Sequence, residues 1–84
     1  MNNTSALDDI GTRVRQLMGA VFGVAVTALG SDASSATIAE WDSVRHLQLM
    51  LALEEEFNLQ FEVDELVSLR SFALIEARLR TSAG

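Results

Sequence analysis

The sequence predicts an all-α protein: a bundle of four helices, the third of them short, with a long loop between the first two. Two observations indicate this fold. The 84 residues include no proline, so no residue of that type interrupts a helix. Apolar residues recur mostly three and four positions apart, the spacing of one helix face. Residues 24–29 could alternate as a strand, but one strand without a partner is unstable.

The chain length suits one domain covering residues 1–84. A chain of this size forms a single core and buries about 60 to 65% of the surface that it exposes when unfolded. The hydrophobic fraction of 49% and the charged fraction of 21% are typical of globular proteins. Because cysteine is absent, stability must come from packing without disulfides or thiolate metal sites, which fits a reducing compartment.

The first helix is expected over residues 6–22. Ser5 is a suitable N-cap, and Asp8 and Asp9 would lie in the first turn, where the helix dipole favours anions. Glycine is common just after the last residue of a helix, so Gly23 is expected to end this one. The apolar residues of one face follow at helical spacing: Leu7, Ile10, Val14, Leu17, Met18, Val21 and Phe22.

Residues 24–42 are expected to form a long irregular connection. Gly30 and the polar run 31–35 are typical of a loop. Trp41, the only tryptophan, is expected in the core. A loop of this length is uncommon in a compact domain unless it has a function. Three apolar residues are candidates to pin the loop onto the core: Val26, Leu29 and Ile38.

The second helix is expected over residues 43–57, with Asp42 as its N-cap and strong helix formers along its length. At about 100° per residue, Leu51 falls at the boundary between two faces. One face is expected to be buried and to anchor the core, through Leu47, Met50, Leu53 and Phe57. The other face is polar and comprises Arg45, Gln48, Glu55 and Glu56.

Two shorter helices are expected near the C-terminus, over residues 63–69 and 72–80. Leu59 and Phe61 should point inward from the turn that precedes them, and Ser71 should cap the last helix. The last helix has an apolar face of Phe72, Ile75 and Leu79, and two arginines, Arg78 and Arg80, near its C-terminal end, where the dipole favours cations.

The net charge of −6 is unevenly distributed along the chain. Residues 31–65 contain nine acidic residues against Arg45 alone, a net charge of −8. Such a surface repels phosphate backbones and anionic lipid, so we expect a protein partner, and neither nucleic acid nor a membrane. The longest uncharged run, residues 16–31, is too short to span a bilayer. The polar, acidic residues 1–10 do not resemble a secretory signal, and we expect a cytoplasmic protein.

Candidate chemistry centres on Ser43 and His46, three positions apart on the second helix. A Ser-His dyad would need a third, orienting group and a pocket that excludes water, so we expect no catalytic residue and a histidine at the surface or its boundary. The carboxylates of residues 54–56 spread around the helix and predict no metal site. Since Asp42 can supply the cap, the hydroxyl of Ser43 would be free, and a phosphoester there would face unpaired N–H groups and the positive end of the dipole.

These residues resemble a known family. Asp42-Ser43-Val44, at the start of an acidic helix, is similar to the Asp-Ser-Leu signature of acyl carrier proteins. Residues 52–57, with the sequence ALEEEF, resemble the same run in bacterial fatty-acid carriers and stand at the same distance from the serine. Phe61, Leu69 and Ser71-Phe72 fall where the family has apolar positions and the cap of its last helix. The similarity covers most of residues 6–80.

The resemblance implies a bundle of acyl-carrier type in which Ser43 carries 4′-phosphopantetheine. A phosphopantetheinyl transferase would transfer this arm from coenzyme A, and the thiol of the arm would hold acyl groups as thioesters. The protein would be no enzyme; it would present its cargo to acyl-loading and acyl-processing enzymes, as a monomer and without a metal. By position, the residues that dock the transferase and the other partners would be Asp42, Val44, Leu51, Glu54 and Glu55.

Departures from the family pattern argue against a housekeeping fatty-acid role. Val44 replaces the usual leucine, Arg45 and Gln48 stand where acidic residues are common, and Phe61-Glu62 replaces a frequent Ile-Pro. Trp41 before Asp-Ser is instead similar to discrete carriers of polyketide and related biosynthesis. The Gly-Gly-His/Asp-Ser pattern of peptidyl carriers is absent. The alternatives are an aminoacyl or D-alanyl carrier, an unmodified helical interaction module and a small hydrolase.

Overall fold

A computed structural model describes the backbone of residues 6–83 and the side chains of residues 10–81. These residues form α1 (Ala6–Phe22), the 3₁₀ turn η1 (Val26–Ala28), α2 (Ser43–Phe57), α3 (Val63–Ser68) and α4 (Phe72–Ala83). Within residues 6–83 there is no strand, apart from an isolated bridge between Ser34 and Ser71. The all-helical prediction is confirmed. α3 ends one residue earlier than expected, and α4 extends to residue 83.

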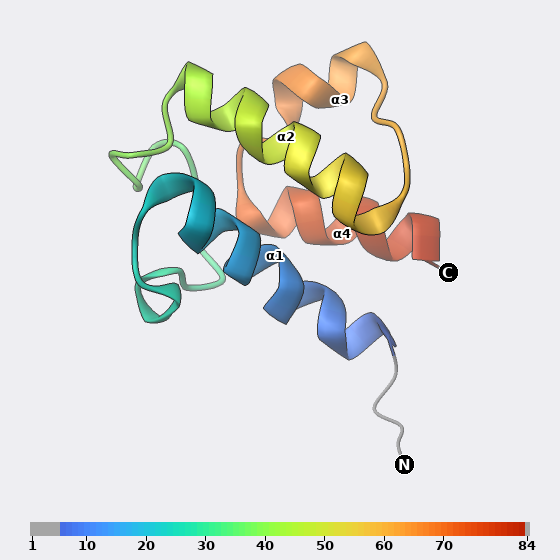
Figure 1. Cartoon of the computed structure of the whole chain (residues 1–84), viewed down its shortest axis with the longest axis horizontal. Helices are drawn as coiled ribbons and strands as arrows, with labels where there is room; N and C mark the ends of the chain where they lie inside the picture. The colour runs from blue at the N-terminus through green and yellow to red at the C-terminus, as the bar shows by residue number, and fades with distance from the viewer. Residues whose placement is uncertain (1–5, 84) are drawn as a thin grey trace.

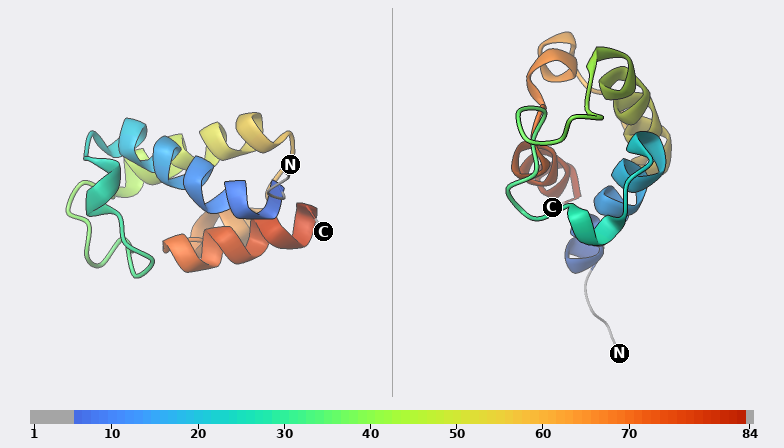
Figure 2. Two further views of the ribbon diagram at one scale, coloured as in Figure 1. Left: turned by 90° about the horizontal axis from the view of Figure 1, so that it is seen from below. Right: turned by 90° about the vertical axis from the view of Figure 1, so that its left-hand side faces the viewer.

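The helices form a small bundle with its connections at opposite ends (Figure 1). The long loop between α1 and α2 lies at one end, and the turn between α2 and α3 lies at the other. α3 lies on the side of the bundle away from α1, as Figure 1 and the right-hand view of Figure 2 show. This arrangement places the start of α2, with Ser43, beside the long loop.

The core forms where α1, α2 and α4 meet. Leu29 is buried in it and Ile38 packs against it, so these two predicted pins of the loop are confirmed, as is the burial of Trp41. Val26 is exposed, contrary to prediction, because η1 places its side chain at the surface beside Gly19. The buried side chains of the two flanking helices are Ile10, Val14, Met18 and Phe22 on α1, and Phe72, Ile75 and Leu79 on α4.

The buried face of α2 includes Met50 and Leu53, as predicted, and Phe57 packs against the core partly buried, but the other positions differ. Leu47 is 55% exposed, whereas Leu49 and His46 are buried. The buried positions 46, 49, 50 and 53 follow the helical spacing of three and four residues. The prediction began this face at the apolar Leu47 because it treated histidine as a surface residue. Because the buried face includes this polar residue, apolar spacing alone assigned Leu47 to it and missed His46 and Leu49.

Capping residues fix the ends of the helices. Asp42 caps α2 by accepting the Arg45 N–H at 2.8 Å, and the Ser71 hydroxyl caps α4 by accepting the Leu74 N–H at 3.1 Å; both caps were predicted. Gly23 ends α1 with a φ of 72°, a left-handed conformation that favours glycine. The predicted cap Ser5 lies outside the described residues, and the side chains of Leu7, Asp8 and Asp9 lie outside the described side chains.

The long loop is joined to the rest of the bundle by backbone hydrogen bonds. Ser35 N–H donates to the Arg70 carbonyl, and Phe72 N–H donates to the Ala33 carbonyl, each at 2.9 Å. The Arg15 guanidinium donates to the Leu29 carbonyl at 2.9 Å. These bonds hold the loop against α1 and the start of α4, so the loop that leads into Ser43 has a defined path.

Candidate functional site

Ser43 is the first residue of α2, and its side chain is exposed. The preceding Asp42 supplies the cap oxygen to the Arg45 N–H. Within the described part of the chain, the Ser43 hydroxyl makes no hydrogen bond. A helix start leaves its first N–H groups without helical partners. The hydroxyl therefore lies in solvent beside backbone donors that suit an anionic substituent.

Asp42 and Arg45 form an ion pair beside Ser43. The Arg45 guanidinium donates to the second carboxylate oxygen of Asp42 at 2.8 Å. The backbone N–H of Arg45, followed by its guanidinium charge, lowers the pKa of the Asp42 carboxyl below its usual value. Asp42 is therefore ionised at neutral pH, and the nearby arginine cancels its charge at the start of α2.

Three exposed apolar side chains run along α2 from this point. Val44 is 66% exposed and Leu51 is 65% exposed, and the exposed Leu47 lies between them at helical spacing. We call these three residues the α2 stripe. Large apolar side chains gathered on one exposed helix face are typical of a contact surface for another protein. Leu47 belongs to the stripe although the sequence predicted its burial.

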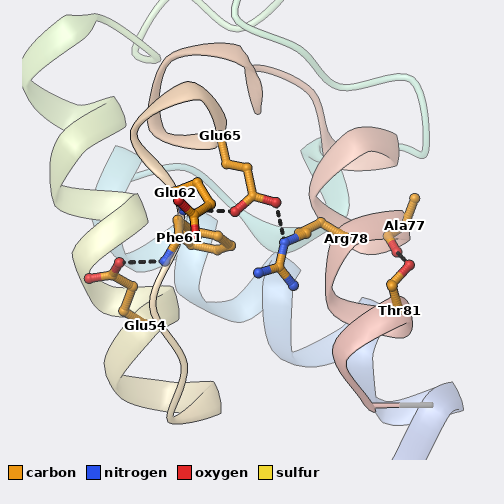
Figure 3. Close-up of polar contacts among 7 residues, drawn as sticks. All are labelled: Glu54, Phe61, Glu62, Glu65, Ala77, Arg78 and Thr81. Atoms are coloured by element: carbon orange, nitrogen blue, oxygen red, sulfur yellow. Dashed lines mark hydrogen bonds and ion pairs between the residues drawn. The ribbon is translucent and has the colours of Figure 1, made fainter.

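The three consecutive glutamates of α2 have different surroundings. Glu54 is half-buried and accepts the backbone N–H of Phe61 at 2.8 Å (Figure 3). Glu56 forms a 2.9 Å ion pair with Arg13 of α1. Glu55 is exposed and makes no hydrogen bond or ion pair with the described residues. It follows Leu51 by one helical turn, so it extends the α2 stripe with a negative charge.

His46 is buried, at 1% exposed, so the predicted surface position is wrong. Its Nδ1 accepts the indole N–H of Trp41 at 3.0 Å, and its Nε2 lies 2.7 Å from the carbonyl oxygen of Leu66. Burial lowers the pKa of the imidazole. Both ring nitrogens are thus occupied away from Ser43. A buried Trp41 needs an acceptor for its indole N–H, and this requirement was the signal for His46 in the sequence.

α3 has no fully buried residue. Val63 and Val67 are exposed, whereas Leu66 packs partly buried against the core. The Glu65 carboxylate pairs with Arg78 of α4 (Figure 3), which lowers the pKa of Glu65. The Arg78 guanidinium also lies over the ring of Phe61, 5.6 Å from its centroid. Both apolar and polar contacts therefore attach α3.

Comparison of the sequence with protein-family models and with curated proteins gives no match. The residues and their geometry therefore carry the functional argument. The structure exposes Val44 and Leu51 along α2, and Asp42 and Ser43 at its start. Glu54 is bonded to Phe61 of the turn that follows α2. Their proposed roles in attachment and docking stay predictions.

The described part of the chain contains no group of three or more histidine, aspartate or glutamate side chains that could hold a metal ion. None of the described helices is both long and apolar enough to cross a bilayer.

Proposed function

We propose that this protein is a stand-alone acyl carrier protein that holds acyl intermediates on a 4′-phosphopantetheine arm attached to Ser43. The observation that carries the proposal is the exposed Ser43 hydroxyl at the start of α2. Asp42 supplies the helix cap, so the hydroxyl has no bonding partner among residues 10–81. The surrounding sequence resembles the attachment motif of this family, and the four helices are compatible with its fold.

The residues around Ser43 fit a phosphodiester. Its side chain is exposed, so a transferase could reach it and an arm would have room outside the bundle. The first turn of α2 offers backbone N–H groups and the positive end of the helix dipole. When bound, the arm supplies a thiol that holds the acyl group as a thioester. The chain itself supplies the Ser43 oxygen that anchors the arm and the surface that partner enzymes recognise.

The α2 stripe is the proposed docking surface for the transferase and for the enzymes that load and process the acyl group. Val44 and Leu51 offer apolar contact on the same side of α2 as Ser43, and Leu47 joins them. Glu55 adds a charge that would steer a basic partner surface. Asp42 belongs to this surface, but its charge is already paired with Arg45.

Arg45 and Trp41 favour polyketide or other specialised biosynthesis over housekeeping fatty-acid synthesis. Arg45 is exposed beside Ser43, where a fatty-acid carrier is commonly acidic. Its ion pair with Asp42 reduces the negative charge at this end of α2, which would weaken docking to an entirely basic partner surface. We further propose that the protein acts in the cytoplasm, as a monomer.

The hydrolase alternative loses its support from the geometry. His46 directs its two ring nitrogens at Trp41 and Leu66, and its burial favours the neutral ring. No hydrogen bond joins His46 to Ser43 in the described part of the chain. A general base must reach the proton that it removes, and His46 is occupied elsewhere.

The test is the intact mass of the folded protein after incubation with coenzyme A, magnesium and an active phosphopantetheinyl transferase. We expect the wild type to gain one phosphopantetheine and Ser43→Ala to gain none. Ser68→Ala, which alters an exposed serine at the end of α3, is the matched control and should be modified as the wild type is.

Modification of Ser43→Ala would place the attachment at another residue. Absence of modification in the folded wild type, with a second carrier modified in the same tube, would refute the carrier. The α2 stripe would then favour the alternative, an unmodified helical interaction module.

A further inference from the structure

A line of hydrogen bonds joins three separate elements through His46. The indole N–H of Trp41, at the end of the long loop, donates to His46 Nδ1 at 3.0 Å. His46 lies on α2, and its Nε2 is 2.7 Å from the Leu66 carbonyl of α3. The rings of Trp41 and His46 are stacked, with centroids 6.1 Å apart. One side chain therefore connects the loop before Ser43, α2 and α3.

The hydrogen-bond partners of His46 determine its tautomer. An indole nitrogen can only donate a hydrogen bond and a carbonyl oxygen can only accept one. Nδ1 must therefore be the acceptor from Trp41, and Nε2 must bear the hydrogen that is donated to Leu66. A second proton would have to enter at Nδ1, where it would point at the N–H of Trp41. Protonation is thus incompatible with the Trp41 bond.

The surrounding charges do not compensate a protonated ring. Arg70, in the connection between α3 and α4, is the charge that acts on His46, and it opposes protonation. Asp42 on α2 is paired with Arg45, and Glu65 on α3 is paired with Arg78. The remaining carboxylates of the α3 region, at positions 62 and 64, are exposed to solvent. Burial and Arg70 thus both lower the pKa of His46, against the hydrogen bond to Leu66, which raises it.

The bond to Leu66 does not depend on the charge of the ring. Nε2 bears a hydrogen both in this neutral tautomer and in the protonated ring, so it donates to the Leu66 carbonyl in both forms. The hydrogen bond that protonation removes is therefore the one from Trp41.

We propose that His46 is an acid-sensitive latch, which holds the Trp41 end of the loop on α2 while the ring is neutral and releases it when the ring is protonated. The latch needs no modification of Ser43, so it does not rest on the proposed function. Its direction follows from linkage. Below the ordinary imidazole pKa of 6.5, the open form binds a proton that the closed form excludes, so acid favours opening.

The size of the effect follows from the same linkage. Each unit by which the pKa of the closed form lies below that of the open form raises the opening equilibrium by about tenfold, once the pH is below both values. His46 is the only histidine of the chain, so no other side chain has its ordinary pKa between about pH 5 and 7.

The test is NMR on the folded, unmodified protein between about pH 7 and 5. Ring nitrogen shifts report the tautomer and titration of His46, and hydrogen exchange, corrected for its intrinsic pH dependence, reports opening at Trp41. We expect the Nε2–H tautomer at pH 7. On acidification, the Trp41 indole N–H should lose its protection, and the Trp41 amide, which donates to the Ile38 carbonyl, should exchange faster. The Leu66 and Leu69 amides, and core amides such as those of Val14 and Leu53, should not change.

His46→Gln is the matched variant, because glutamine keeps a donor that can reach Leu66 and does not titrate. Its Trp41 indole N–H and amide should show no acid response in this range. An equal acid response in His46→Gln would overturn the latch. A wild-type His46 that titrates while the Trp41 indole N–H and amide keep their protection would overturn it too, and this measurement does not depend on any variant folding.

Discussion

The backbone N–H of Phe61 donates a 2.8 Å hydrogen bond to the carboxylate of Glu54 (Figure 3). A side chain of the last turns of α2 thereby fixes the turn that leads to α3. The neighbouring Glu55 has no such bond within the described residues and points to solvent. Two adjacent acids of the same proposed docking surface therefore have separable roles.

Glu54→Ala should destabilise the fold, whereas Glu55→Lys should not. Loss of the Glu54 acceptor leaves the N–H of the part-buried Phe61 bond unpaired, which costs about 1 to 3 kcal/mol. An exposed charge changes stability by within about 0.5 kcal/mol. Urea denaturation of the two variants measures the difference. Equal stabilities would show that the Phe61 bond contributes nothing.

Glu55→Lys should instead slow loading by the transferase, and the effect should shrink as salt is added, because salt screens exposed charges. The measurement is the initial rate of phosphopantetheine transfer at low and high ionic strength. Glu55→Gln should have a smaller effect than Glu55→Lys. An unchanged rate at low salt would remove Glu55 from the docking surface.

Leu53→Ala and Leu47→Ala form a matched pair that tests the orientation of α2. Leu53 is fully buried, so its truncation should cost about 2 to 5 kcal/mol. Leu47 is exposed, so its truncation should stay within about 0.5 kcal/mol. Chemical denaturation measures both. Comparable losses would mean that α2 faces the core through Leu47, as its apolar spacing predicted.

Leu47→Glu should impair transferase loading without loss of stability, since it places a charge in the middle of the α2 stripe. Loss of 1.4 kcal/mol of docking free energy would lower kcat/KM about tenfold. Leu74→Glu on α4 is the control, because Leu74 is similarly exposed but lies outside the stripe. Equal losses in the two variants would indicate a general effect of the added charge.

The ion pair between Glu65 and Arg78 should make a pH-dependent contribution to stability. Arg78 lowers the pKa of folded Glu65 below its ordinary value of 4.5. This contribution is therefore present above pH 4.5 and is lost as the pH falls through the folded pKa. The urea midpoint of Glu65→Gln should lie below that of the wild type near neutrality and approach it in acid. A difference in urea midpoint that stays the same at every pH would show that the ion pair makes no pH-dependent contribution to stability.

Local signals in the sequence predicted the helices well. Asp42, Ser71 and Gly23 occupy the ends that their capping preferences indicate, and α1 and α2 have the expected bounds. The Ser43 position followed from the same signals, because a cap at Asp42 leaves the next hydroxyl free. Such rules depend only on neighbours along the chain, which explains their success.

Interactions between distant residues could not be predicted in the same way. The burial of His46 depends on a carbonyl twenty residues later, and its polarity hid it from the apolar pattern. The same error led to the wrong prediction that Leu47 is buried. The bond between Glu54 and Phe61 depends on the path of the intervening turn, which the residue types do not specify.

The bonds between the long loop and the start of α4 have a consequence for the order of events during synthesis. Ala33 and Ser35 find their partners at Arg70 and Phe72, which leave the ribosome long after Ser43 does. A nascent chain that ends before residue 70 cannot form these bonds, so it lacks the ordered approach to Ser43. The proposed recognition of Ser43 on the folded surface would therefore wait until the last helix has been made, and unfinished chains would escape modification.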